Sequence, residues 1–358
     1  MDPIDRPNDD FRERLTLNHI HNICKHNNLP TPTTVVPEPR GNEKVIYHLD
    51  DKFTLQFLVE QRDVDPLHLL SHIDEMPTPE VLAWCENDPT IDGAYLITTK
   101  CKGDRFDLLW HDADENQRVG MLHCLGEGWS RYHSLSPDAV TEKAERLGFS
   151  QLVGDDRATK STWLEQRRDR TIAAIPSIEA FLKQVAERPA ELISAIQEHL
   201  QSTELPSLAP SGLTHSEPWA EHYILEATDD RYVLTGCVDV ERLCIADPAH
   251  EFAVMAASVL AHEKRWLDAF AAGYRIHREL PDDLEQRIHN LAIDHDLWSL
   301  SSSAGKAEWI DGELLDGGEP PRHWRIHCAT GHARRLRKWL GLDTDFNESL
   351  FRAEIGPW

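Results

Sequence analysis

The hydrophobic pattern of the sequence changes its period near residue 100, and this change limits the folds that the chain can adopt. Between 45 and 57, apolar residues recur at every second position on both sides of an Asp-Asp-Lys turn, which predicts a β-hairpin. The apolar run 94–99 is typical of a third strand, and the segment 66–76 carries apolar residues at helical spacing. Beyond residue 103 long helical patterns predominate. The sequence therefore predicts an α+β fold of two lobes, one small and β-rich, the other larger and helical.

The length of the chain supports this division. A chain of 358 residues exceeds what a single hydrophobic core usually serves. We expect residues 1–30 to form a helical N-terminal extension with one helix at 11–27, residues 31–100 to form the small lobe, and residues 101–358 to form the helical lobe. Two lobes leave a cleft between them, and ligands commonly bind in such a cleft.

The charge balance excludes some classes of partner. The chain carries 62 Asp and Glu residues against 37 Lys and Arg, a formal charge of −25. A surface this acidic repels phosphate backbones, and no concentrated basic stretch opposes the repulsion, so we expect no nucleic-acid partner. The acid excess fits either adaptation to high salt or an acidic pocket that attracts cationic substrates.

The location of the protein is predicted from what the sequence lacks. No stretch reaches the 18 uncharged apolar residues that a membrane span needs, and the N-terminus has no apolar signal region. Seven cysteines are scattered without a CxxC spacing, which is typical of reduced thiols. We expect a cytoplasmic protein with no membrane partner.

Ligand-type side chains are concentrated between 213 and 253. A predicted strand ends at His215 and Glu217, and His222 follows five residues beyond the glutamate, beside a second strand. A third strand ends at Asp239, and the next loop holds Asp247. Carboxylates at adjacent strand ends suit phosphoryl transfer, where one orients the attacking hydroxyl and others hold the magnesium ion that neutralises nucleotide phosphates.

At these residues the chain resembles the aminoglycoside phosphotransferase family, kinase-like enzymes that phosphorylate small hydroxylated molecules. The family's catalytic loop, H-x-D-x-x-x-x-N, is represented by His215, Glu217 and His222. Its metal strand, G-x-[IV]-D followed by D-P-x-x-D-[LF]-A, is represented by Gly236, Val238, Asp239, Asp247, Pro248, Glu251, Phe252 and Ala253. The segment 125–135 is similar to the family's helix ending in LHSL, and 272–274 is similar to its late Gly-Tyr helix.

The resemblance implies a two-lobed protein-kinase-like fold and a role for each matched residue. It implies Mg²⁺ with ATP or GTP as cofactor, with Mn²⁺ as an alternative, and a hydroxylated small molecule as acceptor. The implied roles are catalysis by Glu217 and His215, the latter mainly supporting the loop, metal binding by Asp239 and His222, nucleotide binding by Gly41, Asn42 and Gln56, and bracing of the loop by Asp247.

Two departures from the family pattern affect the chemistry of the catalytic loop. Glu217 stands where the family has aspartate, and its extra methylene displaces the carboxylate; a displacement of about 1 Å can cost about 100-fold in rate. His222 stands where the family has asparagine, and imidazole suits manganese or zinc better than magnesium.

A third departure concerns the phosphate-binding lysine of the small lobe. Gln56 occupies its place on the strand 53–58, and a neutral amide cannot balance phosphate charge. The sequence offers Arg62, Lys44 and Lys52 as substitutes, and Glu60 or Asp65 as the carboxylate that would pair with the cation. Lys44 and Lys52 fall near hairpin ends, so neither is an obvious replacement.

Two functions follow from this pattern. The first is a nucleotide-dependent phosphotransferase that acts on a hydroxyl group of a small molecule. The second is a pseudokinase that keeps the fold as a binding or scaffold module. Each site residue also has an ordinary structural alternative: Asp239 as a turn cap, Glu217 as a solvated carboxylate, and His222 as a hydrogen-bonded histidine.

Overall fold

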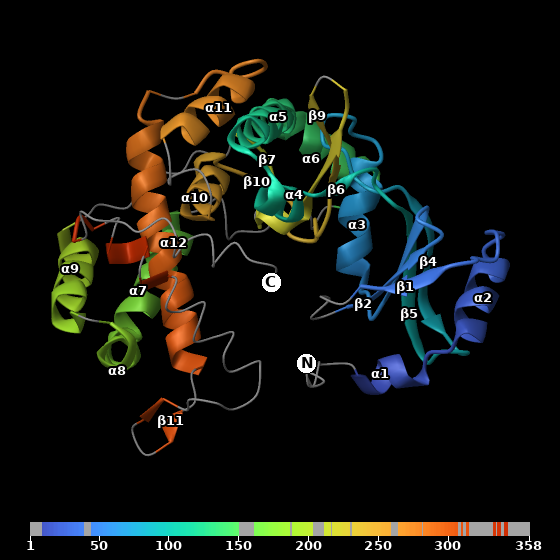
Figure 1. Ribbon diagram of the computed structural model, residues 1–358, viewed down its shortest axis with the longest axis horizontal. Coiled ribbons are helices and arrows are strands. Elements are labelled where there is room, and N and C mark those ends of the chain that lie inside the picture. The colour runs from blue at the N-terminus through green and yellow to red at the C-terminus, as the bar shows by residue number, and fades with distance from the viewer. Residues whose placement is uncertain are drawn as a thin grey trace.

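The computed structural model divides the chain into a small β-rich lobe and a larger, mainly helical lobe (Figure 1). The residues it describes are 9–38, 44–149, 161–186, 188–202, 211–215, 217–229, 231–258, 264–280, 282–306, 309–310, 313–314, 332–333, 335–337 and 340–342. Within this part of the chain no helix is both long and apolar enough to cross a membrane.

A five-stranded antiparallel sheet forms the small lobe. Its order is β1-β2-β3-β5-β4. The strands are β1 (Val35–Pro37), β2 (Val45–Leu49), β3 (Phe53–Phe57), β4 (Val81–Asp88) and β5 (Gly93–Thr99). The predicted hairpin is confirmed as β2 and β3, which pair from Val45↔Phe57 to Leu49↔Phe53. The predicted third strand is confirmed as β5, beside β3.

Helices cover both faces of this sheet. The side chains of Val45, Leu55 and Phe57 are completely buried in a cluster with residues of the N-terminal helices α1 (Asp9–Arg14) and α2 (Leu17–His26). On the other face α3 (Gln61–Leu70) lies between the sheet and the large lobe (Figure 1). Its buried residues share one continuous core with the large lobe.

Two predicted helices have different bounds in the structure. The helix expected at 11–27 is two helices, because the Thr16 side chain caps the start of α2 and accepts a hydrogen bond from the His19 N–H. The helix expected at 66–76 begins at Gln61 and ends at Leu70, with Pro66 inside it. Helices usually accept proline in their first turn, which is why the sequence suggested a later start.

The large lobe consists mainly of helices. They are α4 (Phe106–Asp112), α5 (Glu115–His133), α6 (Pro137–Arg146), α7 (Ser161–Ala173), α8 (Ile175–Val185), α9 (Pro189–Ser202), the short 3₁₀ helix η1 (Ala220–His222), α10 (Ala249–Ser258), α11 (Lys264–Tyr274) and α12 (Leu284–Lys306). Helices α5 and α11 pack closely, and a Cβ atom at Gly273 would lie 1.9 Å from the His123 carbonyl oxygen. Only glycine permits this approach.

The large lobe also contains short strands, which flank the loops of the site. One small sheet has the order β6 (Asp104–Arg105), β8 (Tyr223–Ala227) and β9 (Tyr232–Cys237). Another pairs β7 (Gly212–Thr214) with β10 (Cys244–Ala246). A distant pair is formed by β11 (Trp309–Ile310) and β12 (Glu313–Leu314). The first two sheets bring the ends of β7 and β9, which precede His215 and Asp239, to the same part of the lobe.

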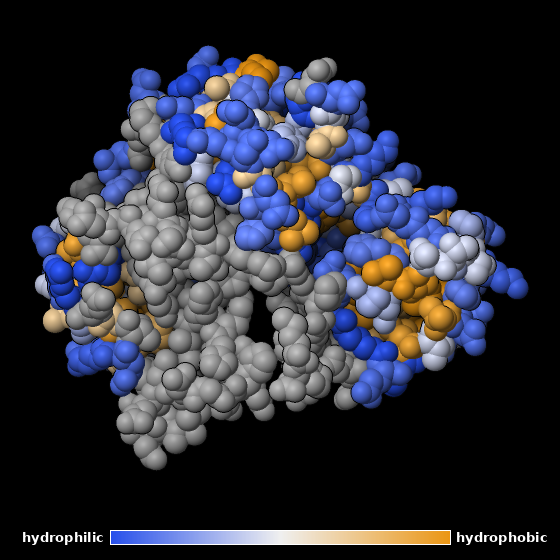
Figure 2. Space-filling view, in the orientation of Figure 1, coloured by the Kyte–Doolittle hydropathy of each residue, from blue (hydrophilic) through white to orange (hydrophobic). Residues whose placement is uncertain are grey.

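Figure 2 shows that hydrophilic side chains cover much of the described surface in view, as the strongly acidic composition leads one to expect. Hydrophobic residues gather mainly over the small lobe on this face.

Candidate functional site

His215 lies at the end of β7 and holds two loops of the site together. Its Nε2 donates a hydrogen bond to the Val238 carbonyl oxygen at 2.7 Å, and its backbone N–H donates to the Glu251 carboxylate. The side chain is fully buried, and burial, together with the neighbouring His222, lowers the pKa of His215 to about 4. At neutral pH it is therefore an uncharged residue that fixes the position of the loops.

His222 joins the loop of Glu217 to Asp239. Its Nδ1 lies 2.8 Å from the Glu217 carbonyl oxygen, and its Nε2 lies 3.3 Å from Asp239 Oδ2. A carbonyl oxygen only accepts, so Nδ1 is the donor and Nε2 faces the carboxylate. The rings of His215 and His222 stack with centroids 5.4 Å apart. Four of the predicted residues, His215, Glu217, His222 and Asp239, are thus linked through His222.

The Glu217 side chain lies beside Arg242, a residue that sequence reasoning did not select. The Arg242 Nε atom is 3.1 Å from Glu217 Oε1, and the two side chains are 49% and 32% exposed. The carboxylate is thus accessible to a substrate while one cation helps to orient it.

Asp239 adopts a strained backbone conformation. Its φ angle is +62°, in the left-handed region that few residues other than glycine occupy. Such strain costs about 1–3 kcal/mol and concentrates at functional sites. Burial raises the pKa of Asp239, but His222, Lys44 and a hydrogen bond with Glu241 outweigh it, so the pKa falls below its ordinary value. The carboxylate is ionised and 39% exposed.

Glu241 adds a further carboxylate beside Asp239. Burial, and then the negative charge of Asp239, raise the pKa of Glu241 to about 7. Glu241 therefore adds a second, partly buried acidic side chain to the surroundings of Asp239.

Asp239 and His222 fit a divalent metal ion. No cluster of three or more His, Cys, Asp or Glu side chains suited to a metal occurs in the described ranges. Magnesium in nucleotide sites, however, is held by one or two carboxylates together with substrate phosphates. Histidine ligands commonly donate their other N–H to a carbonyl, as His222 does. The 3.3 Å between Nε2 and Oδ2 is close to the separation of about 3 Å between adjacent ligands of an octahedral ion.

Glu251 is the carboxylate that contacts the catalytic-loop backbone. It is fully buried, accepts the His215 N–H with one oxygen, and contacts His133 Nε2 with the other. His133 is in turn 3.0 Å from the Tyr274 hydroxyl. The helix containing 125–135 and the Gly-Tyr helix therefore support the loop through one network. In the sequence, Glu251 is marked by its place at the third and last acidic position of the metal-strand motif.

Asp247, which was expected to brace the loop, lies at the start of α10. Its Oδ1 accepts the Ala249 N–H at 2.9 Å, and its Oδ2 pairs with Arg287 of α12. These contacts connect the loop after β10 to two helices.

The predicted nucleotide-binding residues are only partly described. Gly41 and Asn42 lie outside the described residues. Gln56 lies in β3 opposite Ile46 of β2 and Leu96 of β5. It shares the sheet face that is opposite to the buried Leu55 and Phe57.

The structure brings a different small-lobe cation to Asp239. Lys44 Nζ lies 3.3 Å from Asp63, 3.6 Å from Asp239 and 3.5 Å from Glu241. Lys44 directly precedes β2, near the hairpin end as the sequence indicated, and its ammonium nevertheless lies beside Asp239. The acidic partner is Asp63, and neither sequence candidate, Glu60 or Asp65, has this place.

Those two candidates have other neighbours. Glu60 pairs with Arg62 at 2.9 Å on the surface, and Asp65 accepts a hydrogen bond from Gln61. No sequence pattern distinguished Asp63, because all three acids lie in the first turns of one helix.

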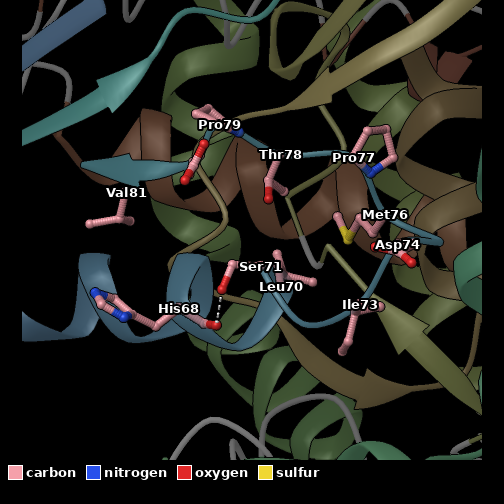
Figure 3. Close-up of a pocket in the computed structure, with 11 residues that line it drawn as sticks. His68, Leu70, Ser71, Ile73, Asp74, Met76, Pro77, Thr78, Pro79 and Val81 are labelled. Atoms are coloured by element: carbon pink, nitrogen blue, oxygen red, sulfur yellow. Dashed lines mark hydrogen bonds between the residues drawn. The ribbon is translucent and has the colours of Figure 1, made fainter.

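A pocket of about 520 Å³ lies between α3 and the segment that leads to β4 (Figure 3). Its lining includes His68, Ser71 and Pro79 but none of the predicted site residues. One wall is anchored to the strand that precedes Asp239, because Pro77 accepts the Cys237 N–H at 2.7 Å. The pocket is thus next to the candidate site and separate from it.

Solved structures with the same architecture are aminoglycoside phosphotransferases. The APH(2″)-IIIa complex with GDP and kanamycin is 12% identical, with TM-score 0.58, covering 91% of this chain and 99% of that one. An APH(4)-Ia mutant complex with ADP and hygromycin B is 12% identical, with TM-score 0.54 and coverage of 91% and 98%. A putative aminoglycoside phosphotransferase from Ralstonia eutropha is 13% identical, with TM-score 0.56 and coverage of 91% and 98%.

These likenesses confirm the predicted two-lobed, protein-kinase-like fold. No curated protein matches the chain. The model of the phosphotransferase enzyme family matches residues 61–286, more than half of the sequence and the region that contains the catalytic and metal motifs. The chain belongs to the phosphotransferase enzyme family.

Proposed function

We propose that the protein transfers a phosphoryl group from ATP or GTP to a hydroxyl group of a small molecule. The observation that carries this proposal is the convergence of Glu217, His222 and Asp239, with His222 in contact with the other two residues. Phosphoryl transfer needs one group that orients the nucleophile and another that holds the metal on the phosphates. In this proposal Glu217 supplies the first group and Asp239 the second. His222 joins the Glu217 backbone to the Asp239 carboxylate, and membership of the family supports the same reaction.

In this reaction Glu217 accepts a hydrogen bond from the acceptor hydroxyl. The hydroxyl oxygen forms a bond to the γ-phosphorus, while the bond from that phosphorus to the β–γ bridging oxygen breaks. The hydroxyl proton passes to Glu217, and the products are a phosphate ester and a nucleoside diphosphate. Arg242 keeps the carboxylate oriented, and the contacts of His215 keep its loop in position.

Asp239 and His222 would hold Mg²⁺, with Mn²⁺ as the alternative that imidazole favours. The ion, when bound, offsets the negative charge of the phosphates. Gly41 and Asn42, which lie between β1 and β2 in the sequence, are proposed to cover those phosphates. In this arrangement the small lobe, residues 31–100, covers the nucleotide, and the large lobe, residues 101–358, supplies the catalytic groups and the acceptor pocket.

The acceptor is proposed to be a hydroxylated small molecule, and cationic ones are favoured by the net charge of −25. Structures similar in fold contain kanamycin or hygromycin B, so these two compounds are the first to test. The alternative function, a binding module without phosphotransfer, depended on the missing lysine at Gln56 and on the departures at Glu217 and His222. The ammonium of Lys44, 3.6 Å from Asp239, weakens the first of these arguments.

Nucleotide binding tests the proposal first. Millimolar ATP or GTP with Mg²⁺ should raise the melting temperature, because a ligand at 100 times its Kd stabilises the folded state by about 2.7 kcal/mol. Consumption of nucleotide with a panel of hydroxylated compounds then identifies the acceptor. No thermal shift with any nucleotide, with Mg²⁺ or Mn²⁺, would favour the binding module.

The variant Asp239→Ala should lower turnover by at least about 1,000-fold, because it removes the only carboxylate proposed to hold the metal on the phosphates. The matched control is Asp229→Ala, which removes an exposed carboxylate from the turn between β8 and β9. Full activity of Asp239→Ala would exclude that residue from the reaction.

A further inference from the structure

Of the three small-lobe cations that the sequence offered as substitutes, Lys44 is the one that contacts the candidate site in the described part of the chain. Lys52 is exposed in the turn between β2 and β3. The Arg62 side chain is 73% exposed and pairs with Glu60. The Lys44 side chain is only 16% exposed and lies among carboxylates of α3 and of the loop after β9. Burial therefore distinguishes Lys44 from the other two.

The register of the sheet explains how Lys44 reaches this position. Ile46 pairs with Gln56 across β2 and β3, and successive side chains alternate between the faces of a sheet. Lys44 precedes Val45, which is completely buried on the opposite face, so Lys44 shares a face with Ile46 and Gln56. Positions related in this diagonal way lie within reach of long side chains. A lysine at position 44 can therefore occupy the space that a lysine at position 56 would occupy.

Asp63 fixes the ammonium from the side of α3. Its Oδ2 accepts the Glu60 N–H at 2.7 Å, which holds the carboxylate at the start of the helix. Its Oδ1 lies 3.3 Å from Lys44 Nζ. The Asp63 side chain is only 9% exposed, so the pair is shielded from solvent.

The ammonium remains charged and is shared among its neighbours. Burial lowers the pKa of Lys44, but Glu241, Asp239 and Asp63 together raise it above its ordinary value. All three Nζ–oxygen distances are 3.3 Å or more, whereas a charge-assisted hydrogen bond is about 2.7–2.9 Å. The contacts with Asp239 and Glu241 are longer than the one with Asp63, so a phosphate oxygen can replace one of them while Asp63 stays beside the ammonium.

We propose that Lys44, supplied by the start of β2, is the cation that contacts the nucleotide phosphates, and that Asp63 positions it. The strand β3, where the resemblance leads one to expect this lysine, supplies only Gln56. The proposal rests on the proposed function, because it assigns a group to the same nucleotide site. It also gives a physical reason why the site can bind nucleotide without a lysine on β3.

The test compares Lys44→Met with Lys52→Met, which removes an ammonium of the same hairpin that lies outside the site. Nucleotide affinity is measured by calorimetric titration of ATP and GTP with Mg²⁺, alongside turnover and the melting temperature without ligand. Lys44→Met should weaken nucleotide binding by about 100-fold, the usual loss when one partner of a desolvated charge pair is truncated. Lys52→Met should bind as the wild type does. Wild-type affinity in a folded Lys44→Met protein would overturn the proposal.

A charge swap separates a phosphate-binding role from a purely structural one. Lys44→Gln combined with Gln56→Lys restores a lysine to the same sheet face from β3. The double variant should recover at least about tenfold of the affinity that Lys44→Gln loses. A double variant that folds and recovers nothing would overturn the proposal, and this comparison remains informative if Lys44→Met fails to fold. If the wild type itself binds no nucleotide, the proposed function fails, whereas normal wild-type binding with an unaffected Lys44→Met variant defeats only the role of Lys44.

Discussion

The two halves of the candidate site are built in different ways. In the large lobe, His215, Glu217, His222 and Asp239 come from one stretch of sequence and are joined by short contacts. In the small lobe, Lys44 comes from a different strand than the family pattern suggests. The comparison indicates that the loops of the large lobe must keep their spacing, because several backbone contacts depend on it. The small-lobe cation needs only to reach the site. A side chain at the start of β2 and one on β3 can both do so, because they lie on the same face of the sheet.

The largest effect should come from the large-lobe half. Glu217→Gln keeps the size of the side chain but removes its ability to take the hydroxyl proton, so kcat should fall about 1,000-fold. Nucleotide affinity should stay near that of the wild type, because the small-lobe contacts are intact. Steady-state kinetics and titration measure the two quantities, with the exposed Glu198→Gln of α9 as the control. Unchanged kcat would show that the large-lobe half does not act on the hydroxyl.

The second prediction concerns Gly103, in the linker 100–103 between β5 of the small lobe and β6 of the large lobe. Gly103 has a φ of +94°, and a Cβ there would lie 2.1 Å from the Leu225 carbonyl oxygen. Gly103→Ala should lower the free energy of unfolding by about 3 kcal/mol, because backbone strain adds to a backbone clash.

Gly148→Ala is the matched control for this prediction. Gly148 also has a positive φ, +82°, but nothing lies within 4 Å of its Cβ position. Gly148→Ala should lower the free energy of unfolding by about 1 kcal/mol, from backbone strain alone. Chemical denaturation measures both variants, and equal losses would show that the linker can move away from β8 at little cost.

The smallest effect should come from Arg242. The Arg242–Glu217 pair is partly exposed, and exposed ion pairs contribute about 0.2–1 kcal/mol. Arg242→Ala should therefore lower kcat by about fivefold or less, and the difference should shrink at high salt. Kinetics at two ionic strengths test this. A loss as large as that of Glu217→Gln would instead place Arg242 in contact with the transferred group, and the large lobe would then supply a cation as well.

Much of the fold could be predicted because its signals are local. The alternation around residues 45–57 identified β2 and β3, and the run 94–99 identified β5. Strands β1 and β4 were not predicted, since β1 is three residues long and the burial of β4 does not alternate. The early start of α3 was missed because a proline in a helix interior is unusual, and only its cap at Glu60 marks the start.

The sequence by itself predicted the residues of the large-lobe half, because His215, Glu217, His222 and Asp239 follow one another closely in the chain, next to β7, η1 and β9. Only the tertiary structure decided the small-lobe half. Lys44, Asp63 and Asp239 are far apart in the chain, and their meeting depends on the register of β2 with β3 and on the packing of α3 against the large lobe. Composition and spacing do not reveal these long-range contacts. Only the tertiary structure shows which of Lys44, Lys52 and Arg62 lies beside Asp239.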